Sequence, residues 1–312
     1  GPFTLDPDAI TIGSFAIKWY AVFIVCGMIT AALYVYFRSK KYGLLLDDLL
    51  DLAIYIVFPA VIGTRLYYVI FKKLEDPSSY TTFWEVINIR DGGLAIYGAI
   101  IAGILALILL AGIKKLRLFR LMDCTAPAVM IAQSLGRWGN FFNREAFGEY
   151  TGSLFAMRLP LDAVRGSDVT DMMSRNIEVI DGIKYIQVHP TFLYESLWNV
   201  GVLLIMLWWR KYKKFDGEIL LMYLFGYGIG RFWIEGLRTE SLMFFGTGLR
   251  VSQVLALMLV FVSAFLIWKM SKKAQNVAEE AVIAETIHEE VAEMVPHLEE
   301  PVSELVEEVE EP

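Results

Sequence analysis

Charged and amide side chains gather in one short glycine-rich segment, GRWGNFFNREAFG at residues 136–148. Helical spacing places Arg137 and Asn140 on one face, and Glu145 follows close behind. Guanidinium groups bind phosphate or carboxylate oxygens through paired hydrogen bonds, so this segment could hold an anion. The alternative is an interfacial anchor with snorkelling arginines, but asparagine and glycine are poor anchors.

A second polar group occupies YLFGYGIGRFWIEGLR at residues 223–238. Tyr227, Arg231, Glu235 and Arg238 recur every three or four residues, which predicts one polar stripe facing into a helical bundle. The three glycines of this segment superficially resemble a nucleotide-binding loop. No strand precedes them, so close helix packing is the better interpretation.

Four further side chains complete the candidate set: Tyr97 in DGGLAIYG, His189 in HPTFLYE, Tyr20 in KWY and Arg65 in GTR. His189 is the only histidine before the acidic C-terminal segment, and its alternative role is structural because proline follows it. For Tyr20 the alternative is an aromatic anchor at a membrane interface. Cys26 and Cys124 lie in or beside apolar runs without CxxC spacing, so no metal site and no cofactor is expected.

The elements that position these residues are apolar helices. Hydrophobic residues make up 56% of the chain and its mean hydropathy is +0.50, which is typical of a membrane protein. A membrane-spanning helix needs ~20 mostly apolar residues. The stretches that qualify are 17–37, 49–71, 93–113, 122–142, 192–209, 217–233 and 251–268. We therefore predict an all-α polytopic membrane protein with about seven transmembrane helices.

Lysine and arginine in short loops predict the orientation, because such loops stay on the cytoplasmic side. Basic clusters follow the first, third, fifth and seventh stretches, and the pair Lys72-Lys73 is the one exception. The N-terminus is therefore expected outside and the C-terminus in the cytoplasm. This orientation places both polar groups at the outer ends of their helices, the fourth and the sixth.

The chain divides into five expected regions. They are an external segment 1–16, transmembrane helices 1–4 in 17–142, an external cap 143–191, helices 5–7 in 192–270 and an acidic cytoplasmic tail 271–312. Alternating residues around Asp181-Gly182 predict a β-hairpin, which makes the cap a small α/β unit. Thirteen glutamates and no lysine, arginine or aspartate follow Lys273, which predicts a disordered tail or a marginal helix. Gly1-Pro2 is expected to be a remnant of protease cleavage.

These motifs together resemble the prolipoprotein diacylglyceryl transferase family. Its signature reads G-R-x-G-N-F-x-N-x-E-x-x-G, and residues 136–148 match it. The motifs around Tyr20, Arg65, Tyr97, His189 and Arg231 follow in the family's order, so the resemblance covers residues from about 18 to 268.

The resemblance implies a role for each matching residue. The family's essential arginine and asparagine fall on Arg137 and Asn140, its second essential arginine on Arg231, and its first-span tyrosine on Tyr20. The family's glutamate falls on Glu145. The remaining expected phosphatidylglycerol ligands are Gly148, Tyr227, Glu235, Arg238, Arg65 and His189.

The implied reaction moves the diacylglyceryl group of phosphatidylglycerol to the lipobox cysteine of a preprolipoprotein. The resemblance implies a location in the bacterial inner membrane, with the active site towards the outer leaflet. The implied partners are phosphatidylglycerol, other membrane lipids and the lipobox signal peptide of a preprolipoprotein, and no nucleic acid is expected. Many members have histidine where this chain has Tyr97, which puts an imidazole base at that position in doubt. A transporter of anions or lipids, with buried arginines as ligands, is the alternative function.

Overall fold

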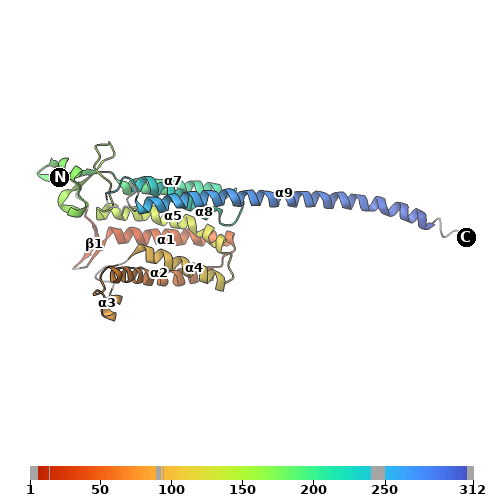
Figure 1. Cartoon of the computed structure of the whole chain (residues 1–312), viewed down its shortest axis with the longest axis horizontal. Coiled ribbons are helices and arrows are strands. Elements are labelled where there is room, and N and C mark those ends of the chain that lie inside the picture. The colour runs from red at the N-terminus through yellow and green to blue at the C-terminus, as the bar shows by residue number, and fades with distance from the viewer. Residues whose placement is uncertain (1–5, 14, 89–92, 94, 240–249, 308–312) are drawn as a thin grey trace.

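The computed structural model is a bundle of long helices, and it describes residues 6–13, 15–88, 93, 95–239 and 250–307. Each predicted span corresponds to one helix. The seven helices are α1 (Trp19–Ser39), α2 (Leu46–Glu75), α4 (Ile96–Ile113), α5 (Leu118–Asn143), α7 (Thr191–Trp209), α8 (Glu218–Glu235) and α9 (Val251–Glu307). Figure 1 shows them lying side by side with roughly parallel axes.

Length and composition separate these helices into two kinds. The segments Trp19–Tyr42, Leu46–Glu75, Thr191–Trp209 and Val251–Val291 are long and apolar enough to cross a membrane. Within α4, Tyr97–Ile113 is apolar but shorter. The helices α5 and α8 carry the polar groups identified from the sequence, and they pack against α7 and against each other. Four apolar helices thus support a membrane protein.

The bundle contains two sets of helices. One set is continuous: α1 packs on α5, α5 on α7, α7 on α8 and α8 on α9. The other is the pair α2 and α4, which pack closely on each other and only lightly on α1 and α5. In Figure 1 this pair forms the lower edge of the bundle.

Two motif glycines allow α2 and α4 to approach at backbone distance. A Cβ atom on Gly63 would lie 2.5 Å from the carbonyl oxygen of Gly98, and a Cβ on Gly98 would clash with Gly63 in return. Only glycine fits at such a contact. These residues therefore hold the pair together.

The chain between α5 and α7 folds into a small unit of its own. The antiparallel strands β3 (Met157–Pro160), β5 (Ile183–Val188) and β4 (Glu178–Ile180) lie in that order. The short helices η2 (Leu161–Ala163), η3 (Gly166–Asp168) and α6 (Asp171–Arg175) connect them. The predicted hairpin is present, and its turn has positive φ at both Asp181 and Gly182.

Four short elements before α4 were not predicted. Strands β1 (Asp8–Ile12) and β2 (Phe15–Lys18) pair as a hairpin before α1. Helix α3 (Phe83–Ile87) is capped by Thr82, whose hydroxyl accepts a hydrogen bond from the Glu85 amide, and η1 (Lys40–Tyr42) extends α1. A side-chain cap is sufficient to define a helix as short as α3.

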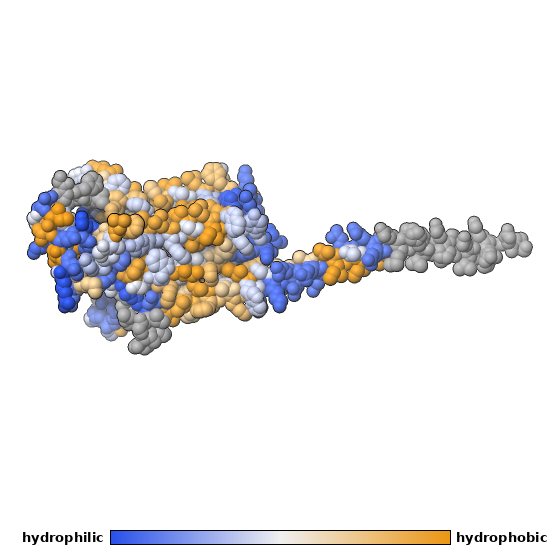
Figure 2. Space-filling model, turned by 90° about the horizontal axis from the view of Figure 1, so that it is seen from above, coloured by the Kyte–Doolittle hydropathy of each residue, from blue (hydrophilic) through white to orange (hydrophobic). Residues whose placement is uncertain are grey.

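The surface and the tail complete the architecture. Figure 2 shows apolar residues around the middle of the bundle and hydrophilic residues gathered at both ends. The composition of residues 271–312 predicts a tail that is disordered or marginally helical. The structure continues α9 to Glu307 as one helix that leaves the bundle (Figure 1).

Candidate active site

Five charged side chains, from α5, α7, α8 and the residues just after α8, form one chain of ion pairs, which we call the arginine–glutamate network: Arg137, Glu195, Arg231, Glu235 and Arg238. Glu195 pairs with Arg137 through one carboxylate oxygen, and its other oxygen lies 3.2 Å from Arg231. Arg231 also lies 2.7 Å from Glu235, which is 3.8 Å from Arg238. Arg137 and Arg231 therefore converge on a single carboxylate.

The network is enclosed and carries excess positive charge. The side chains of Glu195 and Glu235 are 9% and 7% exposed, whereas those of the arginines are 16–26% exposed. Three guanidinium groups face two carboxylates, so one positive charge is left over. Burial, followed by the nearby charge of Arg231, lowers the pKa of Arg238, and Glu235 offsets part of that effect.

An amide and carboxylate branch extends from Arg137. The Arg137 guanidinium lies 3.4 Å from the Asn140 side-chain oxygen, and the Asn140 amide donates to Glu145 at 2.9 Å. Asn143 also reaches Glu145, at 3.4 Å. The helix spacing thus brings the residues of the 136–148 motif together, as predicted.

A backbone junction at Gly148 ties the ends of the three helices together. The Gly148 amide donates to the carbonyl of His189 at 3.0 Å, and the Glu149 amide donates to that of Leu237 at 2.9 Å. A Cβ atom on Gly148 would lie 2.7 Å from the His189 Cβ and 2.8 Å from the Leu237 carbonyl oxygen. Gly148 therefore acts through close packing, which accounts for a glycine at this position.

His189 and Tyr20 lie at the edges of this region. His189 faces the Tyr194 hydroxyl, with Nδ1 3.3 Å from that oxygen. Tyr20 is the second residue of α1 and packs over Gly139, where an added Cβ would lie 2.8 Å from its ring. Gly139 directly precedes Asn140 in α5, so Tyr20 packs on the part of α5 that carries the 136–148 motif.

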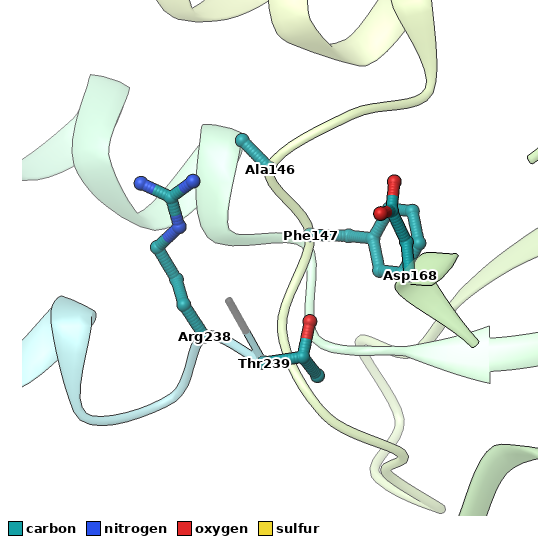
Figure 3. Close-up of a pocket in the computed structure, with 5 residues that line it drawn as sticks. All are labelled: Ala146, Phe147, Asp168, Arg238 and Thr239. Atoms are coloured by element: carbon teal, nitrogen blue, oxygen red, sulfur yellow. The ribbon is translucent and has the colours of Figure 1, made fainter. Parts of the chain in front are cut away.

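A shallow crevice with no internal room for a water molecule lies beside the network and is lined by Ala146, Phe147, Asp168, Arg238 and Thr239. Figure 3 shows Arg238 and Asp168 on opposite sides of the segment that carries Ala146 and Phe147. The Arg238 guanidinium extends along the Ala146 side, away from Asp168. The crevice thus reaches the network at its Arg238 end.

Tyr97 and Arg65 lie on the α2/α4 pair. Tyr97 is 55% exposed, and its ring centroid is 6.2 Å from that of Tyr67. Arg65 donates to the carbonyl oxygens of Glu85, Val86 and Gly93 at 2.7–3.0 Å. These contacts of Arg65 are made with α3 and with the segment that leads into α4, whereas residues 91, 92 and 94 of the motif that contains Tyr97 lie outside the described part of the chain.

The remaining predicted residue, Tyr227, lies on α8 and stacks on Tyr223 at 5.9 Å. The residue that sequence reasoning missed is Glu195. It was visible as an acidic residue within the first turns of an apolar helix, where an unpaired carboxylate would be costly. In the described part of the chain, no three His, Cys, Asp or Glu side chains form a metal-binding group.

The fold is thus that of a helical membrane protein with a partly buried arginine–glutamate network at one end of its bundle. The family model of the prolipoprotein diacylglyceryl transferases matches residues 7–269. The chain belongs to this family. The acidic tail lies beyond the matched residues.

Individual relatives agree with the family match. A phosphatidylglycerol–prolipoprotein diacylglyceryl transferase of Streptococcus pneumoniae (strain Hungary19A-6) is 44% identical over 272 residues, which cover 86% of this chain and 95% of the relative. Transferase 1 of that name from Clostridium perfringens (strain 13 / Type A) is 40% identical over 256 residues, covering 81% and 90%.

Proposed function

We propose that this protein transfers the diacylglyceryl group of phosphatidylglycerol to the thiol of the lipobox cysteine in a preprolipoprotein. The observation that carries the proposal is the convergence of Arg137 and Arg231 on one carboxylate group. Two guanidinium groups aimed at one anionic position can also hold one phosphate group. Family membership supports the reaction, and this geometry supports the assignment of the site.

The reaction forms one bond and breaks one. The cysteine sulfur attacks the phosphate-bearing carbon of the diacylglyceryl unit, forming the carbon–sulfur bond of a thioether. The carbon–oxygen bond to the phosphate breaks, and its electron pair leaves on glycerol phosphate. The thiol proton passes to a hydrogen-bonding group or to water. Negative charge therefore collects on the phosphate, where Arg137 and Arg231 stabilise it.

The positive charge of the network also assists the nucleophile. A free cysteine has a pKa of ~8.5 and is mostly protonated at neutral pH. A nearby cationic site lowers that pKa and increases the thiolate fraction. The same excess charge thus favours both the attacking and the leaving group.

Glu195 keeps the two arginines in place before the lipid arrives. Without a carboxylate between them, two enclosed guanidinium groups would repel each other. When a phosphate enters, it can share or take over the hydrogen bonds that Glu195 accepts. We therefore assign Glu195 an orienting role, beside the phosphate clamp of Arg137 and Arg231.

The other candidates support the headgroup and the clamp. Asn140 and Glu145 orient Arg137, while Glu235 and Arg238 flank Arg231. Gly148 connects the end of α5 to the start of α7 through its hydrogen bond to the His189 carbonyl. Tyr227 lies one helical turn before Arg231 on α8. Tyr20 packs on Gly139, which directly precedes Asn140, whereas Arg65 supports the α2/α4 pair. Tyr97 faces the lipid or peptide substrate as a hydrogen-bonding group.

We also propose seven membrane spans, with the N-terminus and the unit between α5 and α7 outside and the C-terminus in the cytoplasm. The distribution of lysine and arginine supports this orientation. A reporter fused after Arg120 or Lys214 should then report cytoplasm, and one inserted near Gly166 should report the outside. A cytoplasmic signal at Gly166 would contradict the orientation and place the network on the wrong face.

The function is tested with purified protein, phosphatidylglycerol and a lipobox peptide. We expect the peptide to gain the mass of one diacylglyceryl group at its cysteine, with release of glycerol phosphate. A peptide with serine in place of that cysteine serves as the control. A cysteine peptide that gains no mass with active-site residues intact would argue against transfer.

A further inference from the structure

A second carboxylate, Asp123, is enclosed at the end of the bundle opposite the network. Its side chain is 0% exposed. One oxygen accepts hydrogen bonds from the Gly217 amide and from Lys213 Nζ, both at 2.8 Å. The other oxygen accepts from the Leu220 amide at 3.0 Å. Asp123 belongs to α5, whereas its backbone partners begin α8.

Asp123 does for α8 what an N-terminal capping residue normally does. A capping side chain accepts from the second or third amide of its helix, and Leu220 is the third residue of α8. The capping position itself is Gly217, which has a φ of 98° and no side chain. A carboxylate also interacts favourably with the positive end of a helix. The cap is thus supplied by a different helix, and it ties α8 to α5.

Lys213 keeps this carboxylate neutralised. Burial alone would lower the pKa of Lys213, but its hydrogen bonds to Asp123 and Asp216 outweigh that effect and raise it. Asp216 lies 3.0 Å from Lys213 and 2.8 Å from Arg120, in a more exposed position. Lys213 therefore keeps its positive charge at neutral pH, beside the Asp123 carboxylate at 2.8 Å.

The spacing along both helices is equal. Arg137 follows Asp123 by fourteen residues, and Arg231 follows Gly217 by the same fourteen. Fourteen residues extend about 21 Å and make nearly four full turns. The contact of Asp123 with the start of α8 therefore aligns α5 and α8 along their axes at one end of the bundle. At the other end, Arg137 and Arg231 both reach Glu195.

We propose that Asp123 is a positioning residue for the transfer reaction, because by capping α8 from α5 it fixes the axial register that brings Arg137 and Arg231 to one anionic group. A slip of one helical turn is about 5.4 Å, which would part Arg231 from Glu195. This inference rests on the proposed phosphate clamp.

Three variants test the proposal. Asp123→Ala removes the cap and the ion pair, while Asp123→Asn keeps one oxygen that can accept from Leu220. Asp216→Asn is the matched control, because Asp216 binds the same lysine and the structure records no contact with the amides of α8. We expect turnover to fall about a hundredfold in Asp123→Ala, with a raised KM for phosphatidylglycerol, and less in Asp123→Asn. The control should stay within about threefold.

The second readout is the distance between spin labels on α5 and α8. Both Val129 and Trp233 are exposed positions on these helices, and Cys26 is replaced by serine so that labelling is specific. We expect the distance distribution in Asp123→Ala to shift or broaden by up to about one helical turn, ~5 Å. The distribution in Asp216→Asn should match the parent.

Each outcome decides the matter. An unchanged distance in Asp123→Ala would overturn the proposal whatever its activity, and so would a changed distance with normal turnover. If Asp123→Ala does not accumulate in the membrane, the test is made with Asp123→Asn. Label distances and turnover equal to those of the parent in Asp123→Asn would then overturn the proposal. Normal turnover in Arg137→Ala and Arg231→Ala would instead remove the proposed clamp, while the label distances would still measure the register.

Discussion

Arg231 on α8 and Arg65 on α2 are both largely enclosed by a helical bundle, but their recorded partners differ. The recorded hydrogen bonds of Arg65 go to backbone carbonyl oxygens of residues 85, 86 and 93. Arg231 is paired with the carboxylates of Glu195 and Glu235. A phosphate group can compete with a carboxylate for a guanidinium group, because both accept the same paired hydrogen bonds. The partner of an enclosed arginine thus indicates whether it is available for binding.

The helices around the two arginines differ in the same way. Two glycines bring the backbones of α2 and α4 into contact and leave no space between them. Charged side chains from α5, α7 and α8 keep a polar network between those helices. We infer that the first region stabilises the fold and the second carries out the reaction.

The largest expected effect is the loss of either clamp residue. Arg137→Ala and Arg231→Ala should each lower turnover by about a thousandfold, because the leaving phosphate loses a charged donor in an enclosed site. The lysine variants should also be poor, since the guanidinium fork is lost. The control is Arg158→Ala, whose side chain is 55% exposed. Near-normal turnover in both alanine variants, measured with the lipobox peptide, would remove the distinction between the two regions.

Loss of Glu195 should come next. Glu195→Gln leaves two enclosed guanidinium groups without their shared carboxylate, and breaking such a pair costs about 3 kcal/mol. We expect a lower melting temperature in lipid-free detergent and a turnover reduced about a hundredfold. Added phosphatidylglycerol should raise the melting temperature of this variant more than that of the parent, because its phosphate replaces the missing charge. An equal lipid effect in both proteins would argue against a shared binding position.

Tyr97 tests whether the α2/α4 pair contributes to the chemistry. A tyrosine with a pKa of ~10 is a weak base at neutral pH, but it can donate and accept hydrogen bonds. Tyr97→Phe should therefore slow transfer about tenfold, and Tyr97→His should stay active, since imidazole fills the same role. The rate of Tyr97→Phe should rise with pH as the thiol ionises. A variant without turnover even at alkaline pH would make Tyr97 an essential base instead.

Gly98→Ala should affect stability more than turnover. The added Cβ would meet the backbone of Gly63, and overpacking of this kind costs about 1–3 kcal/mol. Thermal unfolding in detergent measures the loss. The control is Gly112→Ala on the same helix, where nothing lies within 4 Å of the added atom. Equal stability of the two variants would contradict the close contact of α2 and α4.

The smallest effect is expected from the tail. A chain ending after Lys273 loses all thirteen tail glutamates but keeps the residues 7–269 that match the family. Turnover per folded protein should stay within about twofold, because α9 leaves the bundle at the end opposite the unit between α5 and α7, and the network residue Arg137 lies near the end of α5 that leads into that unit (Figure 1). A large loss of turnover would mean that α9 supports the site through its extension.

The helices could be predicted from the sequence because an apolar run of ~20 residues can span a bilayer, where its backbone must form its hydrogen bonds internally, as a helix does. The fifth predicted span, 192–209, differs from α7 by one residue. The hairpin at Asp181-Gly182 followed from turn chemistry in the same way. Strands β1 and β2 and helix α3 were missed, since their segments are short and lack a long apolar run.

The pairing within the site could not be read from the sequence. Spacing on one helix placed Arg137 with Asn140, and Arg231 with Glu235, because neighbours on a helix follow from its period. The contact of Glu195 with two arginines depends on the register of three helices. That register is set by tertiary contacts such as Asp123 with Gly217. Contacts between residues on different helices leave no periodic pattern in the sequence, so they could not be predicted from it.

The separation of these partners along the chain has a consequence for biosynthesis. Glu195 is made 58 residues after Arg137, and Arg231 a further 36 residues later. At about 5–20 residues per second, Arg137 waits on the order of 3–12 s for its counterion. During that interval its charge must remain at the lipid headgroups or in the translocation channel, since an unpaired arginine at bilayer depth costs several kcal/mol. We therefore expect α5 to reach its final depth in the membrane only after α7 has been inserted.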